Sequence, residues 1–223
     1  MFFLGLKGGV WWIVFWPAVS FFLVAISYLL GTTFVFGKRI DGSRHWLATV
    51  VLGPHLAFAW TVWSLQVFAS QKPAWQVVND SLIVGRRLRP HEFPDEVDVI
   101  CDLTSEMLDP KPIRNRPGYV CVPMLDANGM ATDKMVALVQ SLCPNEGRRI
   151  LIHCANGYGR TGTVAAAWLV AHRFVESADQ ALELLQSKRP GLRLRRRQRD
   201  CLDEVAKSLR RSTLQSENPS SSC

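Results

Sequence analysis

Charged side chains are nearly missing from the first third of this 223-residue chain. Residues 1–71 contain only five of them: Lys7, Lys38, Arg39, Asp41 and Arg44. The rest of the chain holds 22 of the 26 Lys and Arg residues. A long stretch with so few charges is typical of a segment that lies in a membrane. The composition therefore excludes a uniformly water-soluble chain and predicts an apolar segment followed by a soluble domain.

Paired cysteines and a nucleotide-binding loop are also absent. The six cysteines are scattered without any CxxC pair, which argues against a dense disulfide scaffold and against the usual spacing of zinc ligands. The chain also lacks the Gly-Lys-[Ser/Thr] ending of a Walker phosphate loop. We therefore expect free thiols in a reducing compartment, no metal and no other cofactor.

Two uncharged runs in the apolar segment are long enough to cross a membrane. They extend over about residues 10–36 and 46–69, and a spanning helix needs about 20 apolar residues. Residues 1–71 are therefore predicted to form a transmembrane helical hairpin whose turn is residues 37–45. A cleaved signal peptide is the main alternative, but its apolar core has only about 7–15 residues.

Positive charge orients this predicted hairpin only weakly, because basic residues occur in the turn and on both flanks. The bias of Lys and Arg toward the cytoplasmic side slightly favours both flanks inside. We expect an integral membrane protein with its soluble domain on a reducing, cytosol-like face. If the hairpin is only an anchor, a fragment without residues 1–71 should keep normal activity on small substrates.

Residues 72–211 alternate predicted strands and helices. Four segments rich in β-branched residues predict strands: 76–84, 97–101, 118–125 and 149–153. Thr132 and Ser177 are the predicted caps of two helices. This alternation predicts an α/β domain with a central, mainly parallel sheet flanked by helices. Residues 212–223 are predicted to be a disordered tail.

The most informative stretch is RILIHCANGYGRTG, in which a buried strand precedes a glycine-containing loop and a helix. Cys154 and Arg160 are separated by five residues. The loop amides can form an anion nest, and the following helix adds the positive end of its dipole. The planar fork of Arg160 can hold two phosphate oxygens. The spacing therefore predicts a phosphate site beside a cysteine.

Such an environment also favours the thiolate form of a cysteine. A thiolate can attack phosphorus and form a covalent phosphocysteine, which splits one hydrolysis into two easier steps. Thr161 can donate a hydrogen bond to the sulfur and stabilise it as a leaving group. His153 is predicted to support the loop by hydrogen bonding.

The segment HCANGYGRTG resembles the HCxxGxxR[ST] signature of the protein tyrosine phosphatase superfamily, in the form of the compact dual-specificity phosphatases. The resemblance covers about residues 75–210 and leaves the predicted hairpin outside. It implies that Cys154 is the nucleophile, Arg160 is the transition-state clamp and no metal is needed. The phosphate would be bound by Arg160 and by the backbone amides of Ala155, Asn156, Gly157, Tyr158 and Gly159.

The resemblance also implies a general acid upstream of the loop. Asp126, in VPMLDANG, matches the position of that aspartate, after a strand and a proline. Asp102 and Asp133 are the alternatives, and Asp133 suits the first turn of a helix. Gln198 lies where related enzymes carry a water-positioning glutamine, but the arginines before it depart from the family pattern.

The substrate class remains open at this point. Seven basic residues and no acidic ones lie between Lys188 and Arg199, either as a solvated helix start or as a patch that attracts anionic lipid or substrate. We do not expect nucleic acid as a partner beside a membrane. The leading hypothesis is a protein tyrosine or dual-specificity phosphatase. There are two alternatives: a lipid phosphatase acting on a phosphoinositide or phosphatidylglycerophosphate, and an inactive phosphate-binding adaptor. Cys101 and Cys121 are candidates for a disulfide with Cys154.

Overall fold

A five-stranded sheet forms the centre of the computed structural model, which describes residues 11–143 and 148–217. The strand order is β1-β2-β5-β3-β4, and all neighbours are parallel except the first pair. The strands are β1 (Trp75–Asn79), β2 (Leu82–Arg86), β3 (Val99–Thr104), β4 (Tyr119–Met124) and β5 (Ile150–Cys154). The predicted α/β fold with a mainly parallel sheet is confirmed.

The central strand, β5, is buried along its whole length. Its continuous apolar run predicts this position, because strands covered on both faces lack polar alternation. The single strand predicted for residues 76–84 is instead the hairpin of β1 and β2. The Asn79 side chain accepts hydrogen bonds from the amides of Ser81 and Leu82, at 3.0 and 2.8 Å, and closes the turn. This asparagine turn is concealed by the β-branched residues around it.

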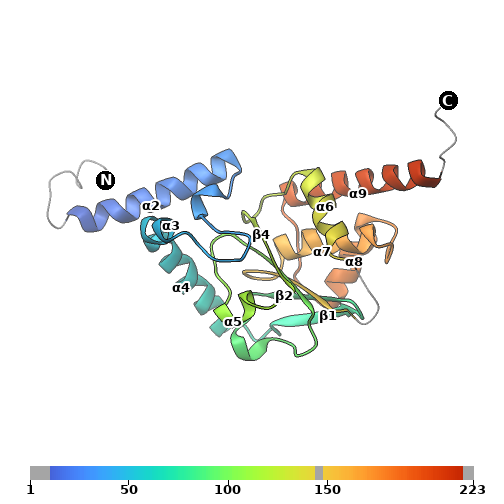
Figure 1. Cartoon of the computed structure of the whole chain (residues 1–223), viewed down its shortest axis with the longest axis horizontal. Helices are drawn as coiled ribbons and strands as arrows, with labels where there is room; N and C mark the ends of the chain where they lie inside the picture. Colours follow the sequence, from blue (N-terminus) through green and yellow to red (C-terminus); the bar gives the residue numbers. More distant parts are fainter. Residues whose placement is uncertain (1–10, 144–147, 218–223) are drawn as a thin grey trace.

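Helix α7 (Gly159–Ala171) packs against β2 and β5. Three further helices pack on it or beside it: α6 (Thr132–Ser141), α8 (Ala178–Lys188) and α9 (Arg196–Glu217) (Figure 1). Ala165, Ala166 and Ala167 of α7 are almost completely buried and let its neighbours approach closely. Because α7 begins directly after the loop that follows β5, this packing fixes the start of the helix beneath the predicted phosphate site.

The observed ends of these helices agree only in part with the ends predicted from the sequence. Ser177 caps α8, and its hydroxyl accepts a hydrogen bond from the Gln180 amide at 3.2 Å. Thr132 does not cap α6, since Ala131 occupies the cap position and the Thr132 hydroxyl donates to Glu204. Helix α9 continues through Glu217, beyond the predicted end of the domain at residue 211. The rest of the predicted tail, residues 218–223, lies outside the described residues.

The N-terminal segment forms α2 (Trp11–Leu30), the short turn η1 (Phe34–Phe36), α3 (Trp46–Val51) and α4 (Gly53–Ala69). Within residues 11–143 and 148–217, one helix is long and apolar enough to cross a membrane: α2, over Ile13–Leu30. The prediction of two transmembrane helices is therefore met only in part. The second apolar run is divided at Leu52, after which α4 begins at Gly53. Pro54 lies in the first turn of α4, where proline is common.

The turn between the two apolar runs also differs from its prediction. Two complete crossings would put residues 37–45 on the far side of a membrane from the soluble domain. Instead, the Lys38 ammonium lies 2.6 Å from the Asp102 carboxylate of β3, and Arg44 donates to the Ser105 carbonyl at 2.9 Å. The turn is thus part of the folded domain, and the structure supports at most one crossing, by α2.

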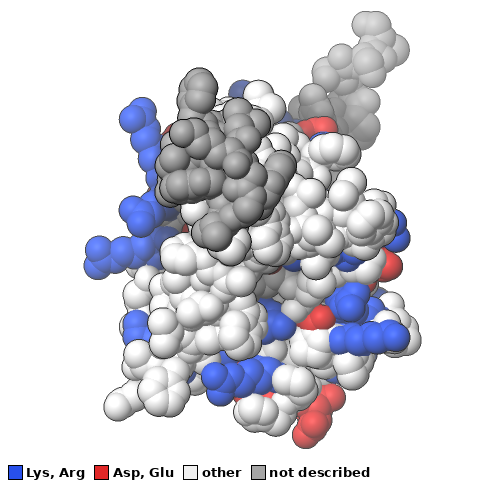
Figure 2. Space-filling model, turned by 90° about the vertical axis from the view of Figure 1, so that its left-hand side faces the viewer, with Lys and Arg blue, Asp and Glu red and all other residues white. Residues whose placement is uncertain are grey.

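The N-terminal helices expose a broad apolar surface. Large apolar side chains are exposed on each helix, among them Ile13, Phe22, Leu29, Trp46, Phe58, Trp60, Leu65 and Phe68. Figure 2 views this side of the molecule and shows a wide uncharged area with Lys and Arg side chains along its margins. Large exposed apolar patches mark sites that contact a membrane or another protein.

Candidate active site

Cys154 is the last residue of β5 and begins the signature loop, residues 154–160. Its side chain is almost buried, with 2% of its surface exposed, and the Gly157 amide donates to its sulfur at 3.3 Å. Gly157 has φ +72°, and a Cβ there would lie 2.5 Å from the backbone of Gly85. Only glycine fits that conformation without strain, so the glycine in this position is required to turn the loop around the sulfur.

Arg160 lies in the first turn of α7 and is held in place by Glu106. Its guanidinium donates to both Glu106 carboxylate oxygens, at 2.9 and 2.7 Å, and to the Met124 carbonyl at 3.1 Å. Burial raises the pKa of Glu106, but the charge and hydrogen bonds of Arg160, with smaller contributions from a backbone hydrogen bond and the Lys38 charge, together outweigh burial and lower it to about 2. Glu106 therefore stays ionised near neutral pH and fixes the fork of Arg160. No sequence motif marks Glu106.

Asp126 follows β4 and is two-thirds exposed. One of its oxygens lies 3.4 Å from Nε of Arg160. Asp126, Cys154 and Arg160 line one cavity of about 460 Å³, which we call the Cys154 cavity. Neither of the two alternative acids lines this cavity: Asp102 is fully buried on β3, and Asp133 is in the first turn of α6. The geometry thus favours Asp126 among the three candidates.

Two residues with predicted supporting roles have defined partners. The buried Thr161 hydroxyl donates to the Gly85 carbonyl at 3.4 Å, and its hydrogen bond to the sulfur remains a prediction. His153 is fully buried, with Nε2 3.0 Å from the Asp109 carboxylate. Burial lowers the pKa of His153, but the charge and hydrogen bond of Asp109, together with the nearby charge of Asp102, outweigh burial and raise it. His153 and Asp109 therefore support the start of the loop as a buried pair.

Lys38 occupies the interior next to this pair. Its ammonium donates to Asp102, to the Thr104 carbonyl and hydroxyl, and to the Met107 carbonyl, at 2.6–2.9 Å. Ligand atoms of Asp102, Asp109 and His153 lie within 4.8 Å of one another, as in a metal site. Burial raises the pKa of Asp102, but the charges of Lys38 and His153 and the hydrogen bonds from Lys38 and Thr104 together outweigh burial and lower it. The ammonium thus supplies a cation beside the carboxylate of this cluster.

Arg189 supports the loop from the side opposite the cavity. Only 3% of its surface is exposed, and its guanidinium donates to the carbonyls of Gly157, Asn156 and Pro73 and to the Gln76 side chain. From sequence, Arg189 is notable only as the end of a helix and a member of the basic run. Its position behind the loop follows from long-range packing.

The N-terminal helices contact the same loop. The Trp63 indole of α4 is buried and donates to the Ala155 carbonyl at 2.9 Å, while the Arg87 guanidinium lies 4.9 Å from its ring. Leu125, next to Asp126, is buried among apolar residues of the N-terminal segment. Tyr28 of α2 lies against the backbone of Asp126. Sequence reasoning missed these contacts because it treated the segment as a separate anchor.

The basic run borders the Cys154 cavity. Arg193 and Arg195 line it, and neither side chain has an acidic partner among the described residues, whereas Arg196 and Arg199 pair with aspartates. Gln198 is buried in the same wall: its oxygen accepts from the Arg195 amide at 3.0 Å, and its Nε2 has no partner in the described part of the chain. Part of the run is therefore a cationic wall of the cavity.

The candidate resolving cysteines are unfavourable for disulfide exchange. Cys101 and Cys121 are buried free thiols on β3 and β4. Burial raises the pKa of both, that of Cys121 to about 12. A thiol must ionise to act as a nucleophile, so the structure gives no support to a rapid disulfide with Cys154.

Several solved structures share the fold of this chain. The crystal structure of Tk-PTP in its active form has a TM-score of 0.54 and 24% identity, over 60% of this chain and 97% of the other. The crystal structure of PTPMT1 in complex with PI(5)P has a TM-score of 0.55 and 15% identity, over 63% of this chain and 99% of the other. The crystal structure of human DUSP28 has a TM-score of 0.51 and 21% identity, over 62% of this chain and 97% of the other. At these identities the likeness shows the fold.

Curated protein sequences give no match to this chain. The family described as "Dual specificity phosphatase, catalytic domain" matches residues 96–207, half of the chain, and this range contains Cys154, Arg160, Asp126 and Glu106. The chain therefore belongs to the dual-specificity phosphatase family.

Proposed function

We propose that this protein hydrolyses a phosphomonoester on a membrane phospholipid through a phosphocysteine intermediate. In the first step, the Cys154 thiolate attacks phosphorus, the bond to the leaving oxygen breaks, and Asp126 donates a proton to that oxygen. In the second step, water attacks the phosphocysteine, Asp126 takes a proton from the water, and the S–P bond breaks. Inorganic phosphate leaves and the thiolate is restored.

The surroundings of Cys154 support these roles. Glu106 accepts one hydrogen bond from each terminal nitrogen of Arg160, and Nε has no hydrogen-bond partner among the described residues. The planar guanidinium therefore keeps donors for two equatorial oxygens of the transition state. The amides of residues 155–159 surround the position of the phosphate. Gln198, whose Nε2 has no partner within the described residues, faces the cavity where the second-step water would bind. Thr161 is one residue after Arg160 and is assigned to stabilise the sulfur as it leaves.

The main support for a lipid substrate is the position of the Cys154 cavity. On one side, the segments that form it contact the apolar N-terminal segment: Tyr28 lies against the backbone of Asp126, and Trp63 donates to the Ala155 carbonyl of the signature loop. On the other side, Arg193 and Arg195 have no acidic partner among the described residues. An anionic headgroup attached to acyl chains matches both surroundings. One structure with the same fold, PTPMT1, was solved with PI(5)P.

A phosphotyrosine-containing protein is the second candidate substrate. It is favoured by the composition of the signature loop, where Ala155, Asn156 and Tyr158 provide no lysine for a polyanionic headgroup. The two candidates differ in where the extra charge of the substrate would bind. A lipid headgroup requires Arg193 and Arg195, whereas a single phosphotyrosine can be held by the loop and Arg160 alone.

The deciding experiment uses the full chain in phosphatidylcholine nanodiscs. Release of phosphate is measured from phosphatidic acid, phosphatidylglycerophosphate and phosphoinositides in the disc, and from soluble phosphotyrosine peptides. We expect kcat/KM for one lipid class to exceed that for every peptide by at least an order of magnitude, and Cys154→Ser to abolish turnover. Higher kcat/KM for peptides would reject the lipid proposal, and turnover by Cys154→Ser would reject the mechanism.

A further inference from the structure

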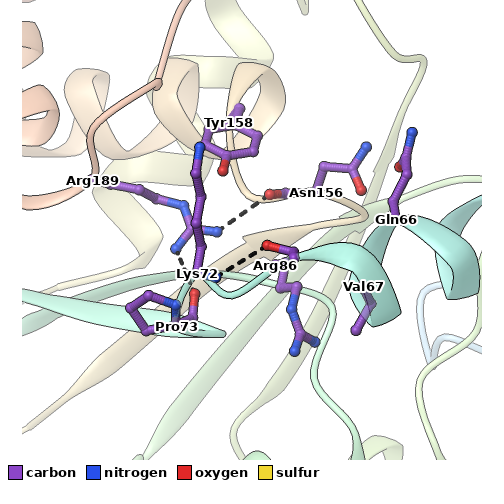
Figure 3. A pocket seen from close by; sticks show the side chains of 9 residues that line it. Gln66, Val67, Lys72, Pro73, Arg86, Asn156, Tyr158 and Arg189 are labelled. Carbon is purple, nitrogen blue, oxygen red and sulfur yellow. Dashed lines mark hydrogen bonds between the residues drawn. The ribbon is translucent and has the colours of Figure 1, made fainter.

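A second pocket lies behind the signature loop, at the end of α4. It has a volume of about 220 Å³, and its walls include Gln66, Ser70, Lys72, Asn156, Tyr158 and Arg189. Figure 3 shows the Lys72 and Arg189 side chains near Tyr158, with Gln66 of α4 across the opening. We call it the α4 pocket. Asn156 and Tyr158 line both this pocket and the Cys154 cavity, so the signature loop separates the two.

The charges of the α4 pocket are unbalanced. Arg189 is almost fully buried, and its four hydrogen-bond acceptors are three carbonyls and the amide of Gln76, all neutral. The Lys72 ammonium lies 5.4 Å from the centre of the Tyr158 ring, and no carboxylate among the described residues pairs with it. Arg86 is already paired with Glu92 at 2.7 Å. Lys72 is exposed, but a buried cation such as Arg189 is costly without a countercharge.

An anion would supply that countercharge. The volume of the pocket suits a single phosphate group, and its polar wall offers the Gln66 amide and Ser70 hydroxyl beside the Lys72 ammonium. The Ser70 hydroxyl oxygen accepts a hydrogen bond from the Lys72 amide at 3.2 Å. The hydroxyl hydrogen can therefore donate to a ligand. The ligand chemistry indicated is thus an oxyanion of the phosphate type.

The position of the pocket indicates where this anion comes from. Its rim includes the last turn of α4, a helix whose outer face exposes Leu65 and Phe68, the latter 87% exposed. A cation just beyond an apolar surface is the usual arrangement for an anionic headgroup at a membrane interface. Lys72 is the first charged residue after the second apolar run, and it points into the pocket.

We propose that the α4 pocket binds the phosphodiester headgroup of an anionic phospholipid, next to the signature loop but apart from Cys154. The site goes beyond the proposed catalytic function, because its ligand is retained rather than hydrolysed. The residues that form it come largely from outside the matched family region, since Gln66, Ser70 and Lys72 precede residue 96. The site is therefore a property of this chain and its N-terminal segment.

The test measures the melting temperature of the full chain in phosphatidylcholine nanodiscs as phosphatidylglycerol is added. A ligand that binds the folded state raises the melting temperature. In Lys72→Gln the midpoint of that rise should move to about fivefold higher phosphatidylglycerol, the loss expected for one cation near an anionic surface. Lys72→Arg should behave as wild type. Lys207→Gln, which removes an exposed lysine on α9, is the matched control.

A second arm adds inorganic phosphate to neutral discs at constant ionic strength. A Lys72-dependent shift with phosphatidylglycerol supports the lipid site, and a shift with phosphate alone would reject the lipid as the ligand. If the midpoint of the rise in melting temperature moves equally in Lys72→Gln and Lys207→Gln, the lipid is attracted to the surface in general, and the proposed site is rejected. A loss in Arg193→Gln but not in Lys72→Gln would place the anion in the Cys154 cavity. Hydrolysis of an aryl phosphate by Lys72→Gln should continue in every case, which separates this test from that of the proposed reaction.

Discussion

Asp126 combines two features that suit a general acid: it is exposed to the Cys154 cavity, and it lies 3.4 Å from Arg160. Replacing it with asparagine removes the proton but keeps the size. We expect Asp126→Asn to lower kcat by about 10²–10⁴-fold on alkyl phosphates, the usual value of general acid catalysis. Activated aryl phosphates, which need no protonation of the leaving group, should lose far less. Equal losses on both substrates would move the role to another residue.

Glu106 is the residue that sequence reasoning missed and the chemistry needs. Its carboxylate makes two charge-assisted hydrogen bonds to Arg160. Glu106→Gln should lower kcat/KM by about one to two orders of magnitude, because hydrogen bonds to charged groups contribute about 1.5–3 kcal/mol. The position of Arg160 rather than its charge would be lost. Unchanged kcat/KM would show that the fork is held without Glu106.

The same pair makes stability depend on pH. The pKa of Glu106 falls from its ordinary value of 4.5 to about 2 in the folded protein, so folding favours its ionised form. The stabilisation is therefore complete above about pH 4.5 and is lost as pH falls toward 2. The difference in free energy of unfolding between wild type and Glu106→Gln should shrink over that range, as measured by denaturant titration at several pH values. A difference that stays constant down to pH 2 would contradict the assigned pKa.

At the scale of elements, the sequence predicted the centre of the domain better than its edges. The apolar run before Cys154 and the alanine-rich stretch after Arg160 each match one element, β5 and α7, because their burial is a local property of composition. Glu106, Asp109 and Arg189 reach the signature loop from distant segments, and no local pattern encodes such contacts. The break at Leu52 was concealed because a proline inside an apolar run is also compatible with a membrane helix.

The turn between α2 and α3 was predicted to join two membrane helices, but in the structure it packs against the catalytic domain. Lys38 is buried against Asp102, and removing one partner of a buried ion pair costs about 3–5 kcal/mol. We expect Lys38→Met to lower the free energy of unfolding by about that amount, measured by denaturant titration. Arg39→Met, which changes an exposed residue of the same turn, is the matched control and should have little effect.

A second substitution separates charge from packing in this pair. In Lys38→Met with Asp102→Asn, no buried charge is left without a partner, so part of the lost stability should return. No recovery would show that the packing of Lys38, rather than its charge, stabilises the turn. The same reasoning revises the expectation for a fragment that begins at residue 72. That fragment lacks both Lys38 and Trp63, so we expect it to be less stable and less active than the full chain.

At the scale of the whole molecule, the apolar surface and the catalytic site belong to one folded unit. The N-terminal segment contacts three parts of the domain. Trp63 donates to the signature loop, Leu125 beside Asp126 packs among N-terminal apolar residues, and Lys38 of the turn pairs with Asp102 of β3. Such an arrangement holds the Cys154 cavity at a fixed position relative to the exposed apolar surface of the N-terminal helices. It also restricts how the chain can cross a membrane, because residues 37–45 cannot be separated from the domain.

This restriction gives a topology prediction. If α2 is the only crossing, an exposed residue in the turn and an exposed residue in the domain must lie on the same side of the membrane. Asp41→Cys supplies a thiol in the turn, and the native Cys143 is an exposed thiol in the domain. In sealed vesicles a membrane-impermeant maleimide should label both or neither, and permeabilisation should change both together. Cys223→Ser removes the thiol of the tail and Cys154→Ser removes the reactive thiol that lines the Cys154 cavity, while Cys101, Cys121 and Cys201 are buried. Labelling of only one of the two sites would mean that the chain crosses twice, and the contact of Lys38 with Asp102 could then not exist in the membrane.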